Sequence, residues 1–576
     1  MQLNKEGKPE MQDLKTGKIY TVDSVAGKTP LIQYLVRGED GGLQCPSAAW
    51  DVEKQEWFDV FLDDARLQAS GMAERQPTDW GHWHGRGMNW NSQCAWCHMT
   101  GYDKKYDAAT NRYASTWKEP GITCIQCHKL ADKPDAEDGC MISKMDRAIS
   151  DSQHDDNCAS CHARREELTN QFTVGDRFDD HFRLELPHVP GVFHPNAVQL
   201  EEDYCETGFR MSRMGNTGVT CYDCHNPHTG GLVFPMDDDQ LCLQCHSTKK
   251  VINGVMAPQV NRNKLCGGHA NRCVDCHMPE MTYMGRDPRR DHALHWPDPR
   301  MSMELGTPDP CLTCHQDKDH QWGADYLEKR YGERIAKYRP RFRAVAAAMK
   351  GANNAEELLT VYAKEEVSAW RAAILQLLAR MPRTPEITKV GQAAATDKDP
   401  LVRAAAASFL SPTESAPLLQ DPVRVVRHAA AWQQFPRVLN MQDVTRALHE
   451  MKATAKLQSD QPTGAMQLAM LADATGNSTE AEAQYRRALK LDPSSAVAHM
   501  DLAVFLARRG RTMEALQQML ACTAANPNNA EAQYRLGLIL LEVGYPAPAR
   551  AALQKAVNID PQHRSARAIL QQLRFK

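Results

Sequence analysis

The sequence lacks a long apolar run and an excess of basic charge, and it has a single cysteine after residue 314. No stretch of about 18 consecutive apolar residues occurs in the 576 residues, so no membrane-spanning helix is expected. The 68 basic and 72 acidic side chains give a net charge of −4, which excludes the basic footprint of a nucleic-acid binder. Of the 19 cysteines, 18 lie at or before Cys314 and only Cys522 follows. A soluble protein with two chemically different parts is therefore predicted.

Fourteen of the cysteines form seven C-x-x-C-H pentads. A zinc site would need paired C-x-x-C units without an obligatory histidine, and a redox dithiol would occur once. Covalent haem c attachment explains every letter, because two thiols bond the porphyrin and the adjacent histidine becomes the proximal iron ligand. The predicted attachment residues are Cys94, Cys97, Cys124, Cys127, Cys158, Cys161, Cys221, Cys224, Cys242, Cys245, Cys273, Cys276, Cys311 and Cys314. The predicted proximal ligands are His98, His128, His162, His225, His246, His277 and His315.

Seven haems between Cys94 and His315 leave about 32 residues each, too few for an ordinary apolar core. The porphyrins are therefore expected to form the core of a loop- and helix-rich domain. Eleven other histidines lie in this half, so most are expected to be distal ligands of irons closed to substrate. The candidate distal ligands are His82, His228, His292, His154, His181, His194, His269 and His320; the remaining three are His84, His188 and His295.

His228 has a steric argument of its own. Only Asn226 and Pro227 separate it from His225, and proline stiffens this link, so both rings cannot reach one iron. His228 is therefore predicted to be the distal ligand of a different haem.

Four cysteines of this half belong to no pentad. They are expected to be buried thiols or two disulfides; the alternative is that one is a sulfur ligand or nucleophile beside a haem. They are Cys45, Cys140, Cys205 and Cys266.

Several stretches within residues 31 to 325 resemble the large bacterial multihaem cytochromes c with a C-terminal tetratricopeptide tail, which are distantly similar to hydroxylamine oxidoreductase. These stretches are LIQYLV, AWDVEKQEWFDV, HWHGRGMNWNSQCAWCH, NRYASTWKEPGITCIQCH, GVTCYDCHNPHTG and CVDCHMPEMTYMGRDPRRDH. The resemblance implies an exported electron-transfer protein, distal-ligand roles for His82, His228 and His292, and an eighth haem on a preceding segment. The chain departs from the family pattern at His84, His295, Cys45 and Cys205.

Haem c is attached outside the cytoplasm, yet residues 1 to 15 contain no apolar signal core. We therefore expect an export signal upstream of Met1 and a periplasmic or otherwise extracytoplasmic location.

The second half is rich in alanine and has helical periodicity. Three similar segments, WRAAILQLL, VRAAAASFL and VRHAAAWQQF, predict HEAT-like repeats within residues 326–460. Further on, glycine, proline and alanine recur every 34 residues, the tetratricopeptide period, over residues 461–576. The predicted architecture is a haem-cored cytochrome c domain over residues 1–325, with a β-hairpin-like segment at 20–62, followed by an all-α repeat solenoid.

The leading functional hypothesis is an electron-carrying cytochrome whose tail docks a redox partner protein. An enzyme acting on a small nitrogen or sulfur compound, such as nitrite, hydroxylamine or tetrathionate, at one open haem is the first alternative. An assembly scaffold is the second. A tail that only stabilises the cytochrome is the alternative to docking.

Overall fold

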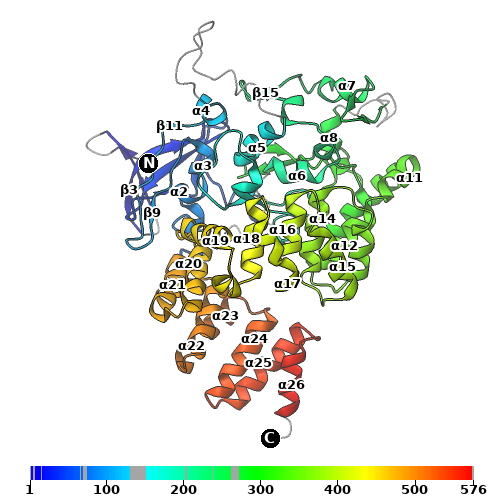
Figure 1. The fold of residues 1–576 in the computed structure, drawn as a ribbon. Coiled ribbons are helices and arrows are strands. Elements are labelled where there is room, and N and C mark those ends of the chain that lie inside the picture. Colours follow the sequence, from blue (N-terminus) through cyan, green and yellow to red (C-terminus); the bar gives the residue numbers. More distant parts are fainter. Residues whose placement is uncertain are drawn as a thin grey trace. The chain divides into compact units, whose positions relative to one another are not determined.

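In a computed structural model the protein divides into two compact units. Figure 1 labels the helices and strands of both. Unit 1 comprises Met1–Leu62, Arg66–Lys118 and Lys452–Lys576, and unit 2 comprises Asp63–Ala65 and Glu119–Met451. Unit 1 thus joins the two ends of the chain, whereas the sequence suggested three consecutive parts. No described helix is long and apolar enough to cross a membrane. The structure describes residues 2–3, 7–13, 16–64, 67–68, 74–129, 151–201, 204–237, 239–260 and 272–573.

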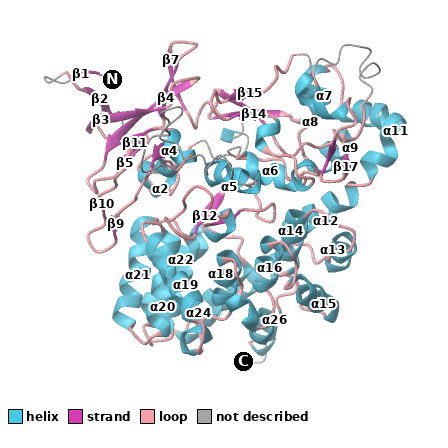
Figure 2. Ribbon diagram, turned by 45° about the horizontal axis from the view of Figure 1, so that its top comes forward, coloured by secondary structure: helices cyan, strands magenta, loops and turns pink. Residues whose placement is uncertain are grey.

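The N-terminal strands of unit 1 form one antiparallel sheet. Its order is β1-β2-β3-β4-β6-β7, and β5 pairs with β4. Two successive hairpins, β3–β4 and β6–β7, occupy the segment expected to be hairpin-like. The long strands β3 and β4 lie side by side in Figure 2. The strands are β1 (Gln2–Leu3), β2 (Pro9–Gln12), β3 (Ile19–Ala26), β4 (Leu31–Arg37), β5 (Leu43–Gln44), β6 (Ala48–Asp51) and β7 (Glu56–Asp59).

This sheet packs against the first pentad. Leu35 and Leu43 bury their side chains against Trp90, which begins α2 (Trp90–Gln93), and Ala95, which begins α3 (Ala95–His98). Asn89 caps α2 by accepting a hydrogen bond from the Ser92 amide at 3.1 Å. Short strands follow: β8 (Met99–Thr100), β9 (Tyr106–Asp107) and β10 (Arg112–Tyr113).

The chain returns to this pentad from its other end, at Asp460. The Asp460 carboxylate is fully buried, forms an ion pair with Lys104 at 2.7 Å, and accepts hydrogen bonds from Ser92 Oγ at 2.6 Å and the Tyr113 hydroxyl at 3.0 Å. Burial acts to raise the pKa of Asp460, but these partners together lower it. We call these four residues the Asp460 cluster.

The first half of unit 2 consists of short helices and two-stranded hairpins (Figure 2). The helices are α4 (Cys124–Cys127), α5 (Asp151–His162), α6 (Cys205–Met211), α7 (Gln240–His246), α8 (Cys273–His277), α9 (Pro299–Leu305) and α10 (Pro310–Cys314), with 3-10 turns η3 (Phe178–Asp180), η4 (Met214–Asn216) and η5 (Cys221–Asp223). The strands are β11 (Glu119–Pro120), β12 (Arg165–Glu167), β13 (Phe182–Leu184), β14 (His225–Asn226), β15 (Gly231–Leu232), β16 (Val251–Ile252), β17 (Val255–Met256), β18 (Glu280–Tyr283) and β19 (Asp287–Arg290).

The second half of unit 2 is helical. The three similar segments are α14, α16 and α18, which pack on one another in chain order. Each has an arginine at the same position, paired with an acidic residue further along the chain: Arg371 with Asp397 at 3.0 Å, Arg403 with Asp421 at 2.7 Å and Arg427 with Glu450 at 2.7 Å. The helices are α11 (His320–Ala336), α12 (Arg339–Met349), α13 (Ala355–Tyr362), α14 (Ser368–Leu378), α15 (Pro385–Ala394), α16 (Pro400–Ala407), α17 (Pro412–Ser415), α18 (Arg424–Gln433) and α19 (Thr445–Leu457).

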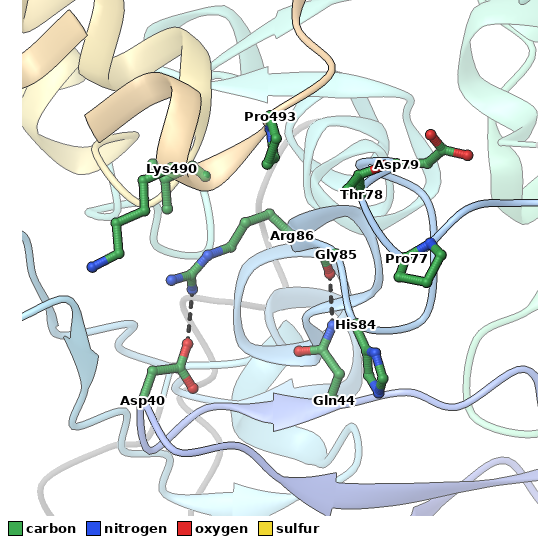
Figure 3. A pocket seen from close by; sticks show the side chains of 11 residues that line it. Asp40, Gln44, Pro77, Thr78, Asp79, His84, Gly85, Arg86, Lys490 and Pro493 are labelled. Carbon is green, nitrogen blue, oxygen red and sulfur yellow. Dashed lines mark hydrogen bonds and ion pairs between the residues drawn. The ribbon is translucent and has the colours of Figure 1, made fainter. Parts of the chain in front are cut away.

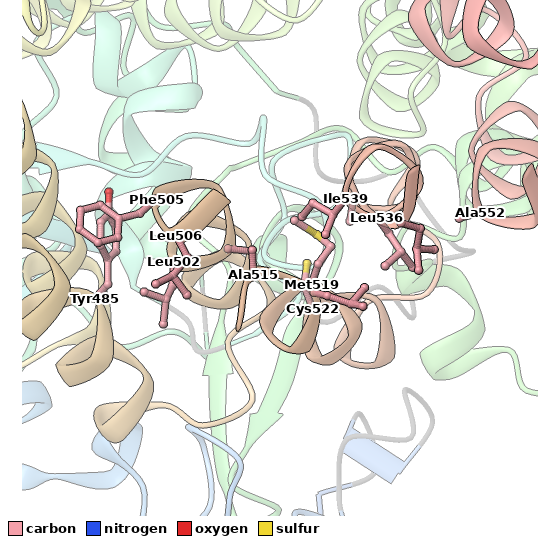
Figure 4. Close-up of a cluster of buried hydrophobic side chains, with 14 of the residues drawn as sticks. Tyr485, Leu502, Phe505, Leu506, Ala515, Met519, Cys522, Leu536, Ile539 and Ala552 are labelled. Atoms are coloured by element: carbon pink, nitrogen blue, oxygen red, sulfur yellow. The ribbon is translucent and has the colours of Figure 1, made fainter. Parts of the chain in front are cut away.

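The C-terminal helices of unit 1 pack as antiparallel pairs. The glycines spaced by 34 residues, Gly476, Gly510 and Gly544, each end a helix with positive φ, which glycine adopts without strain. Between the pairs, Tyr485, Phe505, Met519 and Ile539 form a continuous apolar core (Figure 4). The helices are α20 (Pro462–Ala474), α21 (Ser478–Leu491), α22 (Ala496–Ala507), α23 (Thr512–Ala525), α24 (Ala530–Glu542), α25 (Pro546–Ile559) and α26 (Arg564–Gln572).

Candidate functional site

All seven pentads lie on a single helical turn or at a helix end. A helical turn places two cysteines three residues apart on one face, with the following histidine beside them, as attachment to a single porphyrin requires. None of the fourteen pentad cysteines, all of which the structure describes, forms a disulfide. In chain order, the seven pentads lie on α3 and the residue before it, on α4, at the end of α5, and on η5, α7, α8 and α10.

Three histidines have an orientation suited to iron ligation. The Nδ1 atoms of His246, His277 and His292 each donate a hydrogen bond to a backbone carbonyl, at 2.7, 2.8 and 2.9 Å. The acceptors belong to Pro258, His295 and Arg290 respectively. With its proton on Nδ1, a neutral imidazole keeps the Nε2 lone pair for a metal, which is the usual arrangement of ligating histidines.

Two pairs of histidine rings lie at the spacing of two ligands of one iron. The ring centres of His128 and His228 are 6.1 Å apart with 7° between the planes, and those of His225 and His292 are 6.3 Å apart with 27°. Direct stacking would bring the rings closer. Two metal–imidazole bonds of about 2.0–2.1 Å, plus about 1.1 Å from each nitrogen to its ring centre, would place the centres about 6.3 Å apart. The residues therefore fit a bis-histidine haem at each pair.

Four other histidines of this half have a ring nitrogen that already contacts another protein atom. The Nε2 atom of His181 lies 3.3 Å from Asp176 Oδ2, and that of His84 lies 3.2 Å from the Tyr20 hydroxyl. His295 uses Nε2 to bind the Asn196 carbonyl. His82 accepts a hydrogen bond on Nδ1 from the His84 amide at 3.1 Å, which leaves the proton of a neutral ring on Nε2. In these conformations none of the four offers Nε2 to iron.

The remaining candidate histidines differ in their surroundings. His320 directs Nδ1 to Asp309 at 2.7 Å, and burial lowers the pKa of His194 to about 4, so that ring is neutral at physiological pH. His154 contacts the edge of the Tyr222 ring, with centres 4.8 Å apart. His269 lies outside the described residues.

Successive pentads of unit 2 are neighbours in space. The thiols of Cys158 and Cys221, from the third and fourth pentads, are in hydrogen-bond contact, and this contact raises the pKa of Cys221. Cys242 and Cys273, from the fifth and sixth, make the same contact. The thiols of Cys158 and Cys161 act electrostatically on Cys127, and those of Cys242 and Cys245 on Cys224, so these pentads are near one another; α10 packs against α8.

The cysteines outside the pentads differ in setting. Cys45 is buried among Leu35, Leu43 and Trp90, and burial raises the pKa of its thiol to about 12, so it is an inert core residue. Cys45 and Cys205 are both free thiols, so two disulfides do not form among the four. Cys140 and Cys266 lie outside the described residues.

Unit 1 also contains a cavity of about 310 Å³ (Figure 3). Its wall includes Arg86, which is paired with Asp40 at 3.0 Å, and Lys490 and Pro493 from the C-terminal helices. No pentad residue lines it. The cavity is therefore part of the packing between the first pentad region and the tail, and is not one of the haem sites.

Comparison with known proteins clarifies both halves. The tetratricopeptide repeat family model matches residues 434–496, 466–522 and 501–564. The C-terminal helices are tetratricopeptide repeats. A doubled C-x-x-C-H motif matches residues 215–251, the fourth and fifth pentads, and supports haem c attachment there. No curated protein matches the chain.

Three solved structures show weak similarity. The outer cell wall cytochrome OcwA is 16% identical over 66% of this chain and 85% of its own, with a TM-score of 0.34. MamA is 22% identical, and the match covers 22% of this chain and 74% of MamA, with a TM-score of 0.20. YrrB is described as a tetratricopeptide protein with an unusual peptide-binding site. It is 19% identical, and the match covers 33% of this chain and 92% of YrrB, with a TM-score of 0.22. These scores support no conclusion about this chain.

Proposed function

We propose that this chain is an extracytoplasmic multihaem cytochrome c that carries electrons along seven haems and binds a redox partner through its tetratricopeptide tail. It would belong with the large multihaem cytochromes distantly related to hydroxylamine oxidoreductase. The HEAT-like character of α14, α16 and α18 is part of the same proposal, and their repeated arginine–acid pairs support it.

The observation that carries the proposal is the unbroken series of neighbouring pentads from the second to the seventh in unit 2. Haem c, when bound, supplies reversible one-electron chemistry at each pentad. A relay needs each centre to lie close to the next, and the proximity of consecutive pentads supports this proposal.

The chain's own histidines close the irons. His228 stands opposite His128, and His292 stands opposite His225, at the spacing that two imidazole ligands need. The Arg290 carbonyl fixes the His292 ring by accepting its Nδ1 proton. Two neutral imidazoles give a low-spin iron without an open position, as suits electron transfer.

The tail has two roles in this proposal. Its first helices lie next to the first pentad, because Asp460 and Arg487 contact Ser92 and Tyr106 of that region. Its repeats provide the stacked helix pairs on which tetratricopeptide proteins bind peptides and partner proteins. Stabilisation and docking are therefore both expected, at opposite ends of the same array.

The first test is the covalent haem count. Denaturing mass spectrometry of protein matured with a haem-attachment system should show seven haems on residues 1–576. A count of five or fewer would contradict the proposal.

The second test is His228→Ala. One haem should become high-spin and open to cyanide while the covalent count stays at seven, because His128 then lacks a partner across the iron. The control is His499→Ala, since His499 bonds Gln518 in the tail at 2.8 Å. An unchanged low-spin spectrum in the His228 variant would show that another residue fills this position. A high-spin haem in the unmodified protein would instead favour an oxidoreductase acting on a small nitrogen or sulfur compound.

A further inference from the structure

Two aspartates link neighbouring pentads of unit 2. The Asp155 carboxylate accepts a hydrogen bond from the Cys221 amide at 3.0 Å, and the Asp239 carboxylate accepts one from the Cys273 amide at 2.7 Å. Asp155 lies three residues before the third pentad, and Asp239 lies three residues before the fifth. The two amides belong to the first residues of the fourth and sixth pentads. The same bond therefore joins the third pentad to the fourth and the fifth pentad to the sixth.

These two amides need an acceptor from outside their own helix. Cys221 begins η5 and Cys273 begins α8, and the first amides of a helix have no partner within it. The residue before Cys273 is Arg272, whose side chain carries donors only. In the seventh pentad the same need is met locally, because Asp309 accepts from the Cys311 amide at 2.9 Å. The fourth and sixth pentads take their acceptor from the segment of another pentad.

The sequence repeats this plan twice. An aspartate three residues before the first cysteine occurs only at the third and fifth pentads. An aspartate as the third residue of the pentad occurs only at the fourth and sixth, which read CYDCH and CVDCH. The third and fourth pentads thus form a first module, and the fifth and sixth form a second module of the same design.

Further contacts hold each module together. In the first module, the ring of His154 from α5 meets the Tyr222 ring of the fourth pentad edge-on, with centres 4.8 Å apart. In the second module, the backbone carbonyl of Asp239 accepts a hydrogen bond from the Cys242 amide at 2.9 Å, which fixes this aspartate at the start of α7. Asp239 is 4% exposed, so its bond to the sixth pentad is shielded from water. In both modules the thiols of the two first cysteines are also in contact.

The link between the two modules is of another kind. Gln244 of the fifth pentad donates its side-chain amide to the Asp223 carbonyl of the fourth at 2.8 Å. Lys250 pairs with the Asp223 carboxylate at 3.4 Å, and these two side chains are 39% and 27% exposed, so water weakens the pair. Neither contact involves the first cysteine of a pentad.

We propose that Asp155 and Asp239 are positioning residues that hold four haems of unit 2 as two close pairs, one pair in each module. The proposal rests on haem c attachment, as in the proposed function. Each haem is bonded to its own first cysteine, so holding two first cysteines together holds the attached porphyrin edges together. An electron on one haem then acts most strongly on the other haem of its pair, because electrostatic interaction falls with distance. The relay therefore contains two units that each hold up to two electrons.

The test uses the fully loaded protein in the oxidised state. Low-temperature EPR at two microwave frequencies should show two pairs of haem signals, each split by the neighbouring iron of its pair. Asp155→Ala should remove the splitting of one pair. Asp239→Gly should remove that of the other, because glycine adopts the φ of +60° at this position without strain. Asp155→Asn and Asp239→Asn should keep both splittings, since a carboxamide oxygen still accepts from the cysteine amide. Gln244→Met, which alters only the link between the modules, is the matched control and should leave both splittings unchanged.

The outcomes separate this proposal from the proposed function. Denaturing mass spectrometry gives the covalent haem count of every variant, and a haem missing from the third to sixth pentads of the unmodified protein refutes the proposed function. A full count without paired signals in the unmodified protein refutes the pairing, even if no variant folds. A full count with unchanged splitting in Asp155→Ala and Asp239→Gly refutes the role of the two aspartates. Loss of splitting in the asparagine variants refutes the hydrogen bond as its cause.

Discussion

Asp460→Asn should loosen the attachment of the tetratricopeptide tail to the first pentad region. The Asp460 side chain is 0% exposed and Lys104 is 11% exposed, so the substitution leaves a nearly buried ammonium without its counter-ion. Removing one partner of a buried ion pair costs about 3–5 kcal/mol. We take about 3 kcal/mol, because asparagine keeps part of the hydrogen bonding to Ser92 and Tyr113.

The assay is native-state hydrogen exchange of the fully loaded protein, read by mass spectrometry on peptides from α20 and α21. A loss of about 3 kcal/mol corresponds to about a hundredfold faster exchange through local opening. Adding Lys104→Met should recover part of the loss, since the uncompensated charge is then absent. Lys18→Met is the control, because the Lys18–Glu39 pair is solvent-exposed and should have no measurable effect. Exchange in Asp460→Asn within twofold of the unmodified protein would refute the reasoning.

The same cluster makes a prediction about pH. The pKa of Asp460 is lowered in the folded state, despite the opposing effect of burial, so the folded protein binds fewer protons here than the unfolded chain. Its stabilising contribution is complete above the ordinary carboxyl pKa of about 3.9 and is lost as the pH falls through the lowered value. In Asp460→Asn this part of the acid sensitivity of α20 and α21 should disappear.

Three further predictions concern other parts of the chain. Arg427→Met should lower the free energy of unfolding of unit 2 by about 3–5 kcal/mol in thermal denaturation, because Arg427 is buried against Glu450; a change below about 1 kcal/mol would contradict this. Gly510→Ala should destabilise the tail by about 1–2 kcal/mol in urea, since φ is +73° and no atom lies near the added Cβ; an unchanged midpoint would show that the turn relaxes. Deleting residues 462–576 should alter the EPR signal of the first-pentad haem and leave the other six unchanged; loss of more than one signal would show that the tail supports unit 2 as well.

Much of the candidate site could be predicted from local sequence, because each pentad is complete within five residues and each tetratricopeptide repeat within 34. Local spacing also predicts that α14, α16 and α18 are equivalent, although it does not reveal that their arginines, such as Arg427, each pair with an acidic residue further along the chain. The family comparison confirms the tetratricopeptide period.

Contacts between distant residues could not be predicted in this way. The sequence shows where a histidine lies but not which of its ring nitrogens is available to a metal, so only the hydrogen bonds of the folded protein distinguish His181 from His292. Steric reasoning predicts that His228 serves another haem, but it gives no sign that the ring opposite it is His128, which lies 100 residues away in the chain. The Asp460 cluster joins residues more than 340 positions apart, and nothing in the local pattern around Asp460 marks it.

The return of residues 452–576 to residues 1–118 has a consequence for biosynthesis. A chain made from its N-terminus contains the first pentad long before Asp460 has been translated, so the Asp460 cluster is incomplete until the tail has been made. Unit 2 lies between the two parts of unit 1 in the chain and can fold first. Unit 1 is then completed last, and an unfinished polypeptide leaves Lys104 without its carboxylate, exposed to the proteases that remove incomplete proteins.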